Sequence, residues 1–83
     1  MNIYVGNLPW SIGEAQLKEL FQEIGVVQQA RLILDRQTGQ SRGFGFVEMP
    51  DPDAHKAIER LNGKEIAGRT LRVNDAQKHP SSQ

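Results

Sequence analysis

The sequence predicts an α+β fold in which a four-stranded antiparallel sheet carries two helices on one face. Four short segments are rich in alternating apolar and β-branched residues, and two longer segments repeat apolar residues at helical spacing. Their order is strand, helix, strand, strand, helix, strand, and 83 residues suffice for one small core. This order is that of a ferredoxin-like βαββαβ sandwich.

The first strand and the first helix are predicted near the N-terminus. The strand covers residues 2–6, with Tyr4 on the face opposite its two β-branched neighbours. A helix then runs from about Glu14 to Glu23 and ends near a glycine. Its apolar stripe consists of Leu17, Leu20, Phe21 and Ile24. Its start has two candidate caps, Ser11 at capping-box spacing or Gly13.

The middle of the chain predicts two strands joined by a hairpin. Residues 26–34 alternate apolar and polar side chains, and residues 42–49 are rich in aromatic and β-branched residues. The polar segment 35–41 between them contains a glycine, which is typical of a hairpin loop longer than two residues.

The second helix and the last strand complete the pattern. Asp51 is the expected cap and Pro52 lies in the first turn. The apolar stripe of this helix consists of Ala54, Ala57, Ile58 and Leu61. Residues 65–66 predict a short strand and residues 67–68 a turn, before the last strand at 70–74. We expect one domain over residues 1–76 and a mobile tail over residues 77–83, which hold a proline and two serines.

The aromatic third strand has large apolar side chains on both faces. By alternation, one face carries Arg42, Phe44, Phe46 and Glu48. The other face carries Gly43, Gly45, Val47 and Met49. A strand with two apolar faces is usually buried on both sides, and this is the alternative to a displayed aromatic face.

Fold geometry favours display over burial. Right-handed crossovers place both helices on one face of the sheet, and no element remains to cover the other. The residues expected to face the helices are Ile3, Val5, Val47, Met49, Leu71 and Val73. Tyr4, Phe44 and Phe46 are then expected on the bare face, where an apolar patch generally marks a binding site.

The charge distribution supports a two-sided molecule. The net charge is zero, which by itself argues against a nucleic-acid binder. However, acidic side chains outnumber basic ones in the two predicted helices, and basic ones predominate in the strands, loops and tail. The alternative is an unpatterned mixture of solvated charges.

Flat rings beside arginines suit unpaired nucleobases, because every base has a π face on which an aromatic ring can stack. The arginines that can contact phosphates or stack on bases are Arg31, Arg36, Arg42, Arg69 and Arg72. The side chains that can read base edges are Asn74, Asp75 and Glu48. A duplex is disfavoured, since a sheet face with rings fits no groove without unstacking bases.

Two segments of this sequence resemble the paired motifs of the RNA recognition motif family. Residues 42–48, RGFGFVE, fit the RNP1 pattern K/R-G-F/Y-G/A-F-V-x-F/Y at every position but the last, where Met49 replaces an aromatic residue. Residues 3–8, IYVGNL, are similar to the RNP2 hexapeptide, and the resemblance covers about residues 1–76. The chain also resembles the small single-domain RNA-binding proteins of bacteria and cyanobacteria.

The resemblance implies single-stranded RNA binding, with bases stacked on Tyr4 and Phe44. It further implies that Phe46 packs against sugars, that Arg42 pairs with a phosphate, and that residues 74–76 contact bases. Because Met49 is expected to face the core, the departure at this position affects packing rather than the RNA surface.

Other functions find less support in the sequence. A protein-interaction module that reuses the fold is the main alternative, whereas no catalytic constellation supports a hydrolase, so we expect no enzyme. Trp10 is expected to be a packing lid rather than an RNA contact. His55 and His79 are isolated and the chain has no cysteine, so we expect neither metal nor cofactor.

The expected partner and location follow from the same reading. We expect a monomer that binds single-stranded RNA, with single-stranded DNA as an alternative because stacking ignores the 2′-hydroxyl. No apolar run approaches the ~20 residues that a membrane helix needs, and no signal peptide precedes the first strand. The expected location is therefore cytoplasmic, or nuclear if the source has a nucleus.

Overall fold

A computed structural model describes residues 1–39 and 41–76. The side chains of Ser41 and Arg42 and the predicted tail at 77–83 lie outside this description. The elements are β1 (Asn2–Gly6), α1 (Glu14–Gln22), β2 (Gln29–Leu34), β3 (Ser41–Glu48), α2 (Asp51–Leu61), β4 (Glu65–Ile66), β5 (Arg69–Thr70) and β6 (Arg72–Asp75). Their types and order confirm the predicted βαββαβ pattern, with one small hairpin added.

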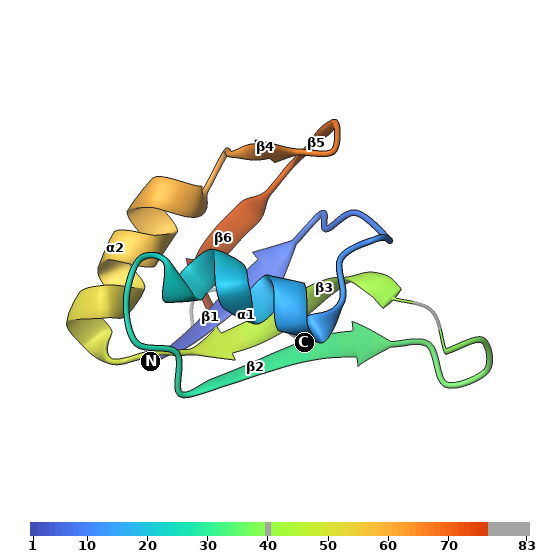
Figure 1. Cartoon of the computed structure of the whole chain (residues 1–83), viewed down its shortest axis with the longest axis horizontal. Helices are drawn as coiled ribbons and strands as arrows, with labels where there is room; N and C mark the ends of the chain where they lie inside the picture. Colours follow the sequence, from blue (N-terminus) through green and yellow to red (C-terminus); the bar gives the residue numbers. More distant parts are fainter. Residues whose placement is uncertain (40, 77–83) are drawn as a thin grey trace.

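The main sheet has the strand order β2-β3-β1-β6, and its neighbouring strands are antiparallel. Strands β1 and β3 therefore occupy the centre, and β2 and β6 form the edges. The view in Figure 1 shows α1 crossing in front of the sheet, with the β4–β5 hairpin projecting at one end.

Among the described residues, thirteen apolar side chains form the core between the sheet and the helices. Helix α1 packs against β2, and α2 packs against β6 and β1. The six residues predicted to face the helices are all at most 1% exposed: Ile3, Val5, Val47, Met49, Leu71 and Val73. The prediction of one core on one side of the sheet is confirmed, including the inward position of Met49.

The helix starts show which candidate caps operate. Gly13 is the N-cap of α1, and its backbone N–H donates to the side-chain oxygen of Gln16 at 2.7 Å. The second helix begins one residue earlier than expected, because Pro50 is its N-cap and Asp51 is already helical. The two acidic residues in the first turn of α2 still favour the positive end of the helix dipole.

The predicted last strand at 70–74 is divided in the structure. Ala67 and Gly68 both have positive φ, 51° and 81°, and form a tight turn of the kind that joins hairpin strands. This turn pairs β4 with β5, so Thr70 belongs to the hairpin. The chain then passes through Leu71 and joins the main sheet only with β6.

Strand β3 contains an irregularity that sequence alternation does not predict. Gly43 has a φ of 85°, and the pairing register of β3 with β2 shifts between Leu32 and Leu34. Between the pairs Leu32–Gly45 and Leu34–Ser41, β3 contains two more residues than β2, an irregularity that bends the strand locally.

Gly45 lies at a close approach between two strands and a helix. A Cβ atom at this position would overlap the backbone carbonyl oxygen of Arg31 and lie 3.1 Å from a methyl carbon of Leu17. The backbone contact cannot be relieved by a side-chain rotation. Glycine is required here because β3 packs against β2 and α1 without space for a methyl group.

We predict that Gly45→Ala lowers the free energy of unfolding by roughly 1–3 kcal/mol, the usual cost of overpacking a core. Urea denaturation measures this change. Gly13→Ala is the matched control, because its Cβ would meet nothing closer than 3.8 Å; we expect this variant to lose less than about 1 kcal/mol, the cost of a weaker helix cap. Equal stability of the two variants would contradict the close packing at Gly45.

Candidate nucleic-acid interface

Three aromatic rings gather on the sheet face that the helices do not cover. The Tyr4 and Phe44 ring centroids are 6.1 Å apart with planes inclined by 28°, a stacked arrangement. Phe46 meets both rings edge-on, at 5.9 Å from Tyr4 and 6.2 Å from Phe44. All three side chains are half-buried, whereas Ile3 and Val5 on the other face of β1 are fully buried. The structure therefore brings together the three predicted platform residues.

Strand register places polar side chains on both sides of these rings. Phe46 lies opposite Arg31 on β2 and opposite Tyr4 on β1, and Tyr4 in turn lies opposite Asn74 on β6. Directly opposed residues on one face of a sheet are close neighbours. One row across the whole sheet thus runs from an arginine through two rings to an amide.

Gly6 allows the Tyr4 ring to lie low over β1. Gly6 follows Tyr4 by two residues and so belongs to the same face. A Cβ at Gly6 would come within 2.8 Å of ring carbons of Tyr4, so any larger residue would displace this ring. The two-residue spacing was visible in the sequence, but its role in seating Tyr4 was not predicted.

The predicted arginines occupy different surroundings. Arg31 and Arg72 are exposed, and both are in register with open-face positions, opposite Phe46 and Gly6. Arg36 is exposed in the β2–β3 loop, outside the sheet. By contrast, the Arg69 guanidinium donates two hydrogen bonds to the Asn7 side-chain oxygen, at 3.0 and 3.3 Å.

Asn7 links this arginine to the end of the β4–β5 hairpin. Its side-chain nitrogen donates to the Thr70 carbonyl oxygen at 2.7 Å, while its own backbone has a φ of 58°. Asparagine tolerates this left-handed conformation better than most residues. Arg69 therefore has a structural partner at the loop and does not belong to the row of platform residues.

The two predicted base-reading residues of β6 differ in position. Asn74 is exposed and opposite Tyr4, as expected. Asp75 lies opposite the core residue Ile3, so alternation assigns it to the helix-side face. An RNA contact of Asp75 therefore stays a prediction without support from the register.

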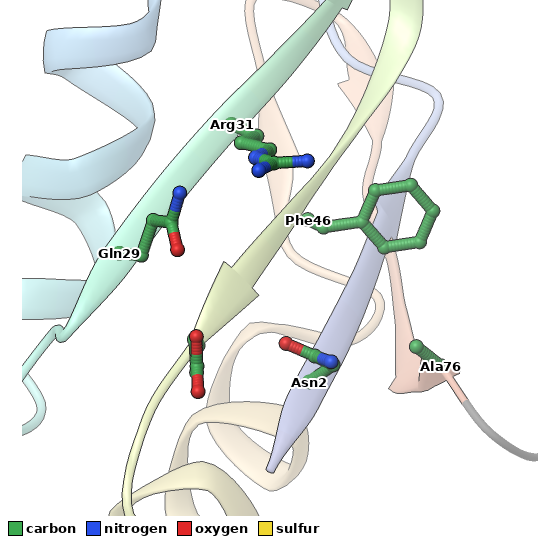
Figure 2. A pocket seen from close by; sticks show the side chains of 6 residues that line it. Asn2, Gln29, Arg31, Phe46 and Ala76 are labelled. Carbon is green, nitrogen blue, oxygen red and sulfur yellow. The ribbon is translucent and has the colours of Figure 1, made fainter.

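A hollow of about 330 Å³ adjoins the rings at one end of the sheet (Figure 2). Its lining residues are Asn2, Gln29, Arg31, Phe46, Glu48 and Ala76. Figure 2 shows Asn2 on β1, Gln29 and Arg31 on β2 and Phe46 on β3, with Ala76 following β6. Asn2 and Gln29 were not predicted as site residues, because only the strand register shows that both lie opposite Glu48.

Trp10 does not act as the packing lid that was predicted, because its side chain is 75% exposed. It borders a second hollow together with Leu32, Leu34 and Gly39. Leu34 is itself 51% exposed, in the part of β2 where the register shifts.

Neither a metal cluster nor a membrane span occurs among the residues that the structure describes. Within residues 1–39 and 41–76, no three histidine, aspartate or glutamate side chains gather as metal ligands would. The helices of this part of the chain are also too short and polar to cross a bilayer.

An uncovered antiparallel sheet with clustered rings and flanking arginines defines the class of single-strand nucleic-acid-binding domains. Within this class, the chain belongs to the RNA recognition motif family, whose pattern it matches over residues 3–72. The resemblance drawn from the RNP1-like and RNP2-like segments is thereby confirmed.

The curated relatives include longer RNA-binding proteins of plants. The chain is 49% identical over 79 residues to the 28 kDa chloroplastic ribonucleoprotein of Nicotiana sylvestris, with 94% of this chain and 29% of the relative covered. It is 49% identical over 75 residues to glycine-rich RNA-binding protein 10 of Brassica napus, with 89% of this chain and 44% of the relative covered. The chain thus spans less than half the length of these relatives.

Solved structures of similar proteins share the fold. The crystal structure of RNA Binding Protein PG1 superposes with a TM-score of 0.89 at 53% identity, covering 96% of this chain and 98% of that one. The structure of the Rna15 RRM with bound RNA (GU) has a TM-score of 0.81 at 29% identity, covering 96% and 87%.

We predict that Phe44→Ala costs only about 1 kcal/mol of folding stability, because the ring is displayed and loses mainly cross-strand contacts. Phe21→Ala, which removes a ring with 0% exposure, should cost roughly 3–5 kcal/mol. Chemical denaturation of both variants measures the difference. A Phe44 variant as unstable as the Phe21 variant would mean that the platform is part of the core.

Proposed function

We propose that this domain binds single-stranded RNA on the open sheet face, without catalysing a reaction. The observation that carries the proposal is the cluster of Tyr4, Phe44 and Phe46, with rings about 6 Å apart on the uncovered face. Leaving such rings in water costs free energy, at roughly 25 cal/mol per Å² of apolar surface. Stacked bases cover the rings and remove this apolar surface from water.

In this mechanism, two to four nucleotides cross the sheet. One base stacks on Tyr4 and the next on Phe44, while Phe46 packs against the sugars between them. Stacking contributes roughly 1–3 kcal/mol per base in single-strand binders. Gly6 supports the mechanism, since it leaves the Tyr4 ring lying low along the strand.

Arginines at the border of the platform contact the bound strand, at its phosphates or its bases. Arg31 and Arg72 are exposed at the two sides of the rings, and Arg36 extends the basic surface into the β2–β3 loop. The resemblance assigns a phosphate contact to Arg42 as well. Asn74, opposite Tyr4, is available to read a base edge, and Asp75 is kept as a weaker candidate.

The relatives support RNA as the ligand. Their names describe ribonucleoproteins or RNA-binding proteins, and the Rna15 structure contains RNA (GU). Single-stranded DNA stays an alternative ligand, because stacking alone does not read the 2′-hydroxyl. A protein-interaction module, the other alternative, gains no support from these names.

We further propose that the protein is a monomer, and we consider its cellular location. The proposed platform needs no second copy of the chain to complete it. The sequence favours a cytoplasmic or nuclear location, whereas the plant relatives include proteins named as chloroplastic.

We expect Tyr4→Ala and Phe44→Ala each to weaken binding of a short single-stranded RNA by about 5- to 150-fold, the loss of one stacking contact. Fluorescence anisotropy with a labelled oligonucleotide measures the Kd. Trp10→Ala is the matched control, because it removes an aromatic ring that is even more exposed but lies outside the platform.

The control distinguishes RNA binding by the platform rings from non-specific binding to any exposed aromatic ring. A large loss in the Trp10 variant combined with no loss in the two platform variants would sink the proposed mechanism.

A further inference from the structure

We propose that the hollow beside Phe46 is a subsite selective for guanine, with Glu48 as the specificity-determining residue. This inference rests on the proposed function and adds a base preference to it. The hollow, of about 330 Å³, is at the lower end of the roughly 300–1,000 Å³ range of ligand pockets. Its size suits one base rather than a larger ligand.

Three strands bring the polar groups of this hollow together. Glu48 lies opposite Asn2 on β1 and opposite Gln29 on β2. Arg31 follows Gln29 by two residues and so shares its face. Phe46 precedes Glu48 by two residues on β3 and so lies on the same face. The Phe46 ring forms the apolar wall of the hollow and continues the aromatic platform (Figure 2).

These polar side chains are free to bind a ligand. Among the residues that the structure describes, Glu48 and Arg31 form no ion pair with each other, and neither side chain has a hydrogen-bond partner. The same holds, within the described ranges, for the side chains of Asn2 and Gln29. A carboxylate and a guanidinium thus border one hollow with unused hydrogen-bonding capacity.

The charges of the hollow favour a neutral ligand. The Glu48 carboxylate repels a phosphate, while the Arg31 guanidinium offsets the charge of the carboxylate. A base is neutral and carries donors and acceptors on its edges, so it can satisfy both groups at once.

Guanine fits this pair of groups better than the other bases. A carboxylate is an acceptor only, and its two oxygens can accept from two neighbouring donors. Guanine presents such a pair, N1–H and the N2 amino group, on its Watson–Crick edge; adenine, cytosine and uracil each present one donor group there. Guanine also offers O6 and N7 as acceptors for the Arg31 guanidinium.

The test uses a labelled uridine pentamer and five variants of it, each with guanosine at one position. The ratio of the Kd of the pentamer to that of each variant gives the guanine preference at each position. We expect one position to favour guanosine by about tenfold, the effect of one good two-bond contact. Inosine at that position lacks the N2 amino group and should lose most of the preference.

The protein variants identify the residue that reads the base. Glu48→Gln keeps the shape but replaces one acceptor oxygen by a donor group, so the preference should fall to about one-to-one. Glu23→Gln is the matched control, because it removes the same charge from an exposed site at the end of α1 and should keep the preference.

The outcomes separate the two proposals. Binding of all pentamers without a guanosine preference, or a preference that survives Glu48→Gln, would overturn the guanine subsite and leave the aromatic platform intact. Absence of binding to any pentamer would overturn the proposed function and the subsite together.

Discussion

The one-sided burial of the sheet determines the rest of this structure. Two right-handed crossovers place α1 and α2 on the same face, where the buried residues of β1, β3 and β6 form the core. Within residues 1–39 and 41–76, no further helix or strand covers the opposite face. Any large apolar side chain on that face is therefore displayed, and its contact with solvent is relieved only by a ligand.

The sheet also determines how the displayed rings are held. Tyr4 and Phe46 are directly opposed on the two central strands, and Phe44 is opposed to Gly6. Because β1 and β3 are paired on both sides, neither is free to slip in register. The platform is thus a property of the most constrained strands, while Arg31 and Arg72 lie on the edge strands and Arg36 lies in the β2–β3 loop.

Local patterns were sufficient to predict the elements, the core and the platform. Alternation alone assigned Ile3 and Val5 to the core and Tyr4 to the open face, because regular strands obey a period of two. The rule did not predict the positive φ of Gly43 or the shift in pairing between β2 and β3. Glycine adopts either sign of φ, so its sequence context did not distinguish a bulge from a regular strand.

Features that depend on pairing between strands were beyond the sequence. The hollow around Glu48 exists because Asn2 and Gln29, from two other strands, lie opposite it, and register is set by tertiary pairing. The division of the last strand follows from a non-glycine residue, Ala67, in a left-handed conformation. Alanine disfavours a positive φ, so the left-handed conformation of Ala67 becomes evident only in the paired hairpin.

The most direct test of the open-face account is an NMR titration of the isotope-labelled protein with a short single-stranded RNA. We predict that the backbone amide signals of β1 and β3 shift most, above all those near Tyr4, Phe44 and Phe46. Shifts confined to α1 and α2, with the signals of β1 and β3 unmoved, would contradict the account and favour a protein-interaction surface on the helices.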